Sequence, residues 1–173
     1  VAVSVMANQS MNYLATGKAP GRIGNAHQNL VPYAVFDCAD GWIIIATGND
    51  AQYRKLCMVL GQNGLGDDPR YATNADRIAH RAELTSAITT ATKGWSKADL
   101  LAACETAGVP AGPINDLAEV FADPQVQARG MGLDMDGVPG VRSPFTFSGA
   151  ELALGTASPV LGADTPRWRD RPQ

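Results

Sequence analysis

The pair Asp40-Gly41, set between two runs of strand-forming residues, restricts most strongly how this chain can fold. Residues 33–38 (YAVFDC) and 42–47 (WIIIAT) are rich in β-branched and aromatic side chains. An Asp-Gly pair between two such runs is typical of the turn of an antiparallel hairpin. The second run is apolar throughout, so we expect its strand to be covered on both faces.

Helix signals follow the hairpin. Tyr53, Leu56, Cys57 and Leu60 have the i, i+3, i+4, i+7 spacing of a buried helical stripe, and Asp50 can cap that helix. Start signals near residues 74, 96, 116 and 124 predict further helices. The predicted fold class is therefore α+β, with a hairpin-containing sheet and several helices.

Glycine, proline and asparagine accumulate on both sides of this unit. Residues 18–29 form a connector after a helix predicted over about 2–15, and from residue 130 onward glycine and proline recur, with strand-like pieces at 133–135 and 145–147. Two connectors on one small domain suggest that both lead to a second body. We expect three parts: residues 1–31 as the end of a large domain and a linker helix, 32–130 as the small α/β domain, and 131–173 as a returning linker and tail.

Composition excludes several kinds of partner. A net charge of -3 and a pI near 5.3 leave no basic surface for nucleic acid. No run reaches the roughly 18 apolar residues that a membrane span needs.

Cys38, Cys57 and Cys104 are odd in number and widely spaced, which favours buried free thiols in a reducing cytoplasm over disulfides. No spacing of His, Cys, Asp and Glu predicts a metal site, and no motif predicts a serine hydrolase or a phosphate loop.

Two polar segments are candidates for a binding site. Residues 24–29 (GNAHQN) lie in the first connector, where glycine allows close approach to a ligand and amides can bind carboxylates. The alternative is an ordinary connector with a surface histidine.

Residues 48–50 (GND) lie where a buried strand ends and a helix begins, a place where polar groups converge on anions. The alternative there is plain helix capping. The candidate substrate-binding residues are Asn25, His27, Gln28, Asn29, Asn49 and Asp50.

A third polar cluster points to no function. His80 lies among Arg77, Arg81 and Glu83 on what the pattern predicts to be a solvated helix face.

Taken together, these segments resemble the family III CoA-transferases, the group that includes formyl-CoA transferase, the carnitine CoA-transferases and α-methylacyl-CoA racemase. The order and spacing of several short motifs carry the resemblance. The matching stretches are residues 14–20, 24–33, 39–43, 48–50, 68–74, 107–115, 123–130 and 161–162.

The resemblance implies a Rossmann-like large domain, a small α/β domain joined to it by linkers, and two interlocked subunits. It also implies that an aspartate attacks an acyl-CoA and passes CoA to an acceptor carboxylic acid through a covalent intermediate. No permanently bound cofactor is implied, since the CoA thioester is a substrate. The implied aspartate lies upstream of Val1 and the implied returning C-terminal segment is replaced by residues 166–171, so we expect no catalytic residue here and no activity from this chain alone.

Two other functions stay open. The racemase branch of the family has an acidic residue near the position of Asp50, so a 2-methylacyl-CoA racemase is one alternative. A non-catalytic dimerisation or binding module is the other.

Residues 27–30 (HQNL) replace the glycine-rich loop of the formyl-CoA branch, so we do not expect oxalate to be a substrate. The uncapped apolar start of the chain predicts an upstream truncation and an exposed patch that favours self-association; its members are Val1, Val3, Val5, Met6 and Met11.

Overall fold

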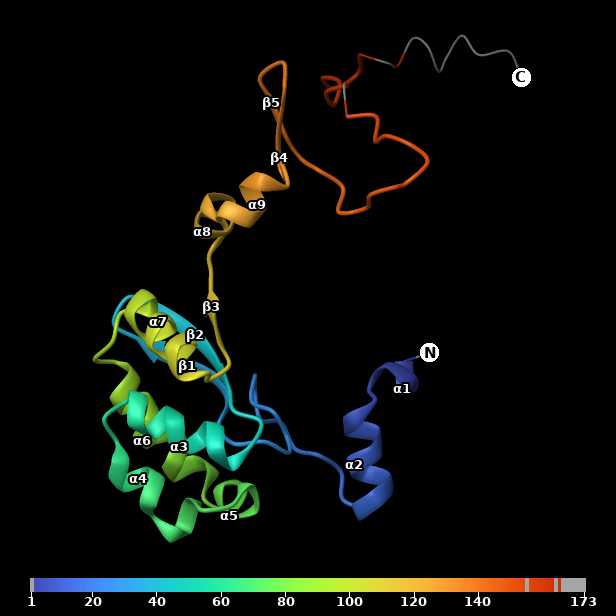
Figure 1. The fold of residues 1–173 in the computed structure, drawn as a ribbon. Helices are drawn as coiled ribbons and strands as arrows, with labels where there is room; N and C mark the ends of the chain where they lie inside the picture. Colours follow the sequence, from blue (N-terminus) through green and yellow to red (C-terminus); the bar gives the residue numbers. More distant parts are fainter. Residues whose placement is uncertain (1, 155, 164, 166–173) are drawn as a thin grey trace. The chain divides into compact units, whose positions relative to one another are not determined.

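The computed structural model describes residues 2–154, 156–163 and 165, and the chain divides into two compact units, Val1–Ile114 and Asn115–Gln173. Strands and helices both contribute to the first unit (Figure 1), which confirms the α+β class. The predicted domain boundaries at residues 31 and 130 concern a larger protein and stay a prediction.

The centre of the first unit is an antiparallel sheet in the order β1-β2-β3, formed by Tyr33–Cys38, Gly41–Ala46 and Ala111–Ile114. Cys38 pairs with Gly41, so the predicted hairpin is confirmed with Ala39 and Asp40 as its turn. Gly41 has a φ of 148°, and a Cβ there would meet the Lys97 side chain at 3.1 Å, which explains the glycine.

Helices cover one face of this sheet. Ala34 pairs with Ile45 and Phe36 with Ile43, and all four side chains are buried, so they lie on the same covered face. Trp42 on the other face is 55% exposed. The expectation that β2 is covered on both faces is therefore wrong for the described chain, because the helices that contact the strands of the unit bury only alternate side chains.

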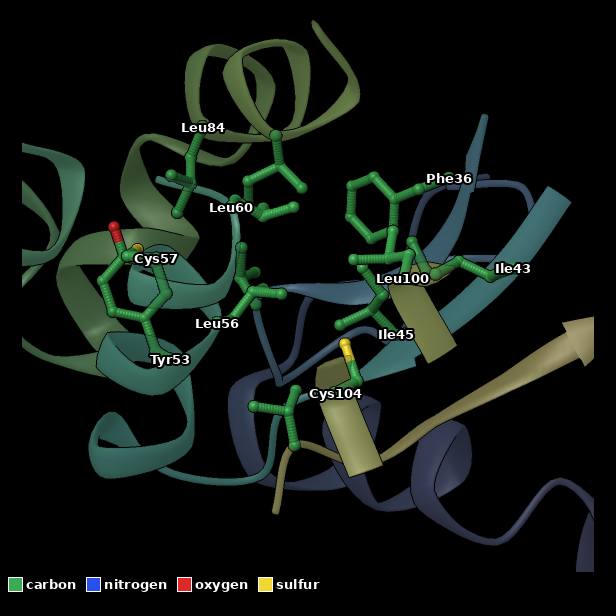
Figure 2. Packing of buried hydrophobic residues seen from close by; sticks show 14 of the residues in the cluster. Phe36, Ile43, Ile45, Tyr53, Leu56, Cys57, Leu60, Leu84, Leu100 and Cys104 are labelled. Carbon is green, nitrogen blue, oxygen red and sulfur yellow. The ribbon is translucent and has the colours of Figure 1, made fainter. Parts of the chain in front are cut away.

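The helices after the hairpin follow the predicted stripes. Tyr53, Leu56, Cys57 and Leu60 are buried as expected, and Leu84, Ile88, Leu100 and Cys104 complete the core. Figure 2 shows these side chains gathered between the helices and β2. The helical elements are α3 (Asp50–Val59), α4 (Asn63–Asp67), the 3-10 turn η1 (Pro69–Tyr71), α5 (Asn74–Ala79), α6 (Arg81–Thr92) and α7 (Lys97–Ala107).

Local signals placed most helix ends. Ser96 caps α7 and Gly108 ends it in the left-handed conformation. Two predicted helices are broken: Ala7, with a φ of 37°, separates α1 (Ala2–Val5) from α2 (Asn8–Thr16), and His80 separates α5 from α6. Thr73, in a capping box with Asp76, begins α5 in place of the predicted Asn74.

The second unit holds the predicted capping box of Asp116 with Glu119 and the predicted proline at the first position of a helix, Pro124. Residues 145–147 form no strand, so that expectation was wrong. Its elements are α8 (Leu117–Ala122), α9 (Pro124–Ala128) and the β4-β5 hairpin (Gly132–Met135 and Val138–Val141).

The described residues form neither a membrane-spanning helix nor a cluster of metal ligands. Among the helices that the structure describes, none has the length and hydrophobicity to cross a membrane. In residues 2–154, 156–163 and 165, no group of three His, Cys, Asp or Glu side chains is placed to hold a metal ion.

The core predicts a contrast within one helix. Leu56→Ala, at a side chain with no exposed surface, is expected to lower the free energy of unfolding by about 2–5 kcal/mol. Met58→Ala on the same helix, at a side chain that is 62% exposed, is expected to change it by less than about 0.5 kcal/mol. Urea unfolding followed by circular dichroism measures both values, and similar losses in the two variants would contradict the packing described here.

Candidate functional site

The first predicted segment, residues 24–29, is held in place through its backbone. His27 donates its backbone N–H to the Tyr33 carbonyl at 2.8 Å, which closes the loop against β1. Arg81 on α6 donates to the carbonyl oxygens of His27 at 3.0 Å and Gln28 at 2.7 Å. Burial lowers the pKa of the Arg81 guanidinium, but a guanidinium stays protonated at neutral pH. The loop therefore has a defined path and is not a loose connector.

Asn74, at the start of α5, fixes the next part of the same loop. Its Nδ2 donates to the Asn29 carbonyl at 2.8 Å, and its Oδ1 accepts the Val31 backbone N–H at 3.1 Å. A carboxamide can donate and accept at once, which suits it to bracing a turn of backbone. The backbone of the loop is thereby fixed at residues 29 and 31.

Arg77 connects the loop to the second predicted segment. Its side chain is 1% exposed and donates to the Val31 carbonyl and to Asp50 Oδ1, both at 2.7 Å, and to the Tyr71 carbonyl at 2.9 Å. The guanidinium also lies over the Tyr53 ring, 4.6 Å from its centroid. The two segments predicted separately from the sequence are thus joined through one buried cation.

Residues 48–50 serve largely structural purposes. Asn49, and not Asp50, is the N-cap of α3, since its Oδ1 accepts the Gln52 backbone N–H at 2.9 Å. Asp50 is the first helical residue and pairs with Arg77. The cap that the sequence assigned to Asp50 is therefore Asn49, and a binding role for Asn49 and Asp50 stays a prediction.

The other four predicted residues meet helix α2 in one pocket of about 280 Å³. Asn29 Nδ2 donates to Asn12 Oδ1 at 2.9 Å, which ties the loop to α2. Among the described residues, no Asp, Glu, Lys or Arg lines the pocket, which we call the amide pocket after its predominant side chains. Its lining residues are Asn8, Gln9, Asn12, Asn25, Ala26, His27, Gln28, Asn29 and Tyr33.

His27 has a defined tautomer in this pocket. Its Nδ1 accepts the Asn29 backbone N–H at 3.0 Å, so Nε2 is the nitrogen that carries the ring proton. The ring stacks on Tyr33 with centroids 5.0 Å apart. Asn25 Oδ1 accepts the Val35 backbone N–H at 3.1 Å. These contacts fix the side chains of His27 and Asn25 at the wall of the pocket.

Sequence reasoning missed the residues that organise this site. Arg77 and Arg81 were assigned to a solvated face, which is wrong for Arg77 because the loop carbonyls and Asp50 draw its guanidinium inward. Their spacing of four residues, which is typical of one helix face, was the available signal. Gln9 and Asn12 gave none, because α2 reaches the loop only in three dimensions.

Comparison with known proteins identifies the family. Residues 1–165 match the family model described as CoA-transferase family III. The chain belongs to this family.

Members of known sequence and structure show how far the similarity extends. A succinate–glutarate CoA-transferase of Agrobacterium fabrum is 52% identical over 164 residues, covering 92% of this chain and 41% of that protein. The human succinyl-CoA:glutarate CoA-transferase is 32% identical over 170 residues, covering 94% and 38%. The crystal structure of a CAIB/BAIF family protein from Brucella suis is 52% identical with a TM-score of 0.85, covering 96% of this chain and 44% of that one. The chain spans about two-fifths of the length of these family members.

The buried cation predicts a contrast between two arginines. Arg77→Ala is expected to lower the free energy of unfolding by about 3–5 kcal/mol, because it removes a buried pair and leaves the loop carbonyls without a donor. Arg70→Ala, at an exposed side chain paired with Asp68 and Glu83, should have a much smaller effect. Urea unfolding measures both, and equal effects would show that Arg77 does not brace the loop.

Proposed function

We propose that this chain supplies the acid-binding wall of an enzyme that moves CoA between carboxylic acids. The observation that carries the proposal is the family match over residues 1–165 together with 52% identity to a succinate–glutarate CoA-transferase. The amide pocket supports it, because carboxamide and imidazole N–H groups bind carboxylates.

The proposed division of chemistry follows from what lines the pocket. Its lining residues include no Asp, Glu, Ser, Cys or Lys that could act as a nucleophile, and Asp50 is engaged with Arg77. In this proposal the aspartate that takes the acyl group lies outside this chain. Its carboxylate attacks the thioester carbonyl and releases the CoA thiolate, leaving a mixed anhydride. The thiolate then attacks the aspartyl carbonyl, which releases the first acid and leaves an aspartyl-CoA thioester. The acceptor acid takes CoA from this thioester by the same steps in reverse.

The proposal predicts no exchange by the purified 173-residue chain. Incubation with succinyl-CoA and glutarate should give no glutaryl-CoA above the uncatalysed rate, measured by liquid chromatography. The Agrobacterium fabrum relative is the positive control in the same assay. Glutaryl-CoA formation by the chain would contradict the assignment of the nucleophile to a segment outside it.

Racemisation of a 2-methylacyl-CoA is the alternative, with Asp50 as the candidate base. Asp50 lies at the start of α3, and its side chain is 43% exposed despite the bond to Arg77. Uptake of deuterium at the α-carbon of such a thioester in heavy water, lost in Asp50→Asn, would favour this reaction over CoA transfer.

Self-association is a second part of the proposal. Val3, Val5, Met6 and Met11 are between 56% and 78% exposed on α1, α2 and the segment between them, and Val1 lies outside the described residues. An apolar surface of this kind favours contact with a second copy or another domain. Sedimentation should detect a dimer or larger species that Val5→Ser with Met11→Ser weakens; a monomer at all concentrations would contradict it.

A further inference from the structure

Three buried polar atoms lack a hydrogen-bond partner among the described residues, and all three belong to side chains of residues that line the amide pocket. They are Gln9 Oε1, Asn12 Nδ2 and Gln28 Oε1. A buried polar atom without a partner costs roughly 1–3 kcal/mol, so natural structures keep few of them. Their concentration in one pocket points to a ligand that completes the hydrogen bonds.

The chemistry of these atoms indicates what the ligand is. Neither glutamine oxygen accepts a hydrogen bond. Rotating each side-chain amide by 180° exchanges its oxygen and nitrogen, so it breaks no bond of the oxygen and directs Nε2–H groups to the same place. Together with Asn12 Nδ2, the pocket then offers three neutral donors. An ionised carboxyl group accepts up to about four hydrogen bonds, and two or three N–H donors suffice to hold it in its charged form.

The surroundings of the pocket indicate what the carboxylate is attached to. Gln9, Ala26 and Gln28 also line a larger groove of about 780 Å³. That groove is lined mostly by apolar side chains, including those of Met6, Tyr13 and Leu14, and Arg22 also lines it. A short methylene chain would gain from burial there while its charged end enters the amide pocket. An α,ω-dicarboxylic acid has this combination, and a fatty acid or a monocarboxylic acid lacks the second charged end.

We propose that the amide pocket, through Gln9, Asn12 and Gln28, binds the carboxylate remote from the reacting end of the acid substrate and so selects dicarboxylic acids. The inference rests on the proposed function, because it assumes that an acid is the ligand. It goes further in assigning selectivity to α2 and the loop of this chain.

The test is a titration of the ¹⁵N-labelled chain with glutarate and with pentanoate, its five-carbon monocarboxylic counterpart, at constant pH and ionic strength. The side-chain NH₂ signals of Gln9, Asn12 and Gln28 report directly on the proposed donors. Glutarate is expected to shift them saturably, and pentanoate to bind at least tenfold more weakly.

Variants separate recognition from folding. Gln28→Leu, similar in volume, should weaken glutarate binding at least tenfold, and Gln28→Glu should weaken it further by repulsion between like charges. Gln62→Leu, at an exposed glutamine before α4, is the matched control and should leave binding unchanged. Backbone signals of each variant show whether its fold is retained.

Three results would overturn the inference: equal binding of glutarate and pentanoate, unchanged glutarate binding by folded Gln28→Leu, or a response to pantetheine without a response to glutarate. The last result would assign the amides to the coenzyme arm. The titration needs no turnover, so its failure is distinguishable from failure of the exchange assay, which concerns the proposed function itself.

Discussion

The buried guanidinium of Arg77 is the interaction on which the arrangement of the site depends. Removing a charge from water costs several kcal/mol unless it is paired and its donors are satisfied. Arg77 meets that requirement with Asp50, the Val31 carbonyl and the Tyr71 carbonyl, and with the face of the Tyr53 ring. These groups come from the loop before β1, the start of α3 and the turn η1. The hydrogen bonds of Arg77 therefore fix these three segments relative to one another, because moving any of them would leave a buried N–H without a partner.

This bracing divides the loop into two functional parts. Its carbonyl oxygens are used by Arg77, Arg81 and Asn74, whereas several of its side-chain amides face the amide pocket. A loop whose backbone is held by such hydrogen bonds can keep its side chains in a fixed position without being a regular helix or strand. Glycine-rich and asparagine-rich composition, which from the sequence suggests flexibility, is compatible here with a defined binding surface.

The sequence predicted the features that depend on neighbouring residues. The Asp-Gly hairpin and the helix starts at Ser96 and Asp116 follow from interactions within a few positions, and the structure confirms them. The predictions that failed depend on contacts between distant residues, such as the exposure of Trp42 and the burial of Arg77. The loop was recognised as a polar connector, and residues 48–50 as a polar strand end before a helix. Their connection through Arg77, and the contribution of Asn12 seventeen positions from Asn29, could not be read from local patterns.

In the proposed function, neutral amides suit an enzyme that must exchange one acid for another. An arginine or lysine in the pocket would hold a carboxylate more tightly through a charge-assisted bond. Such binding stabilises the bound acid and the transition state equally, so it lowers the KM without raising the kcat. It would also slow the departure of the first acid, which has to leave before the acceptor enters. In the proposed site, three neutral donors would distinguish a carboxylate from a methyl group, since the methyl group would leave them without partners, and would release the acid more readily than a charged donor would.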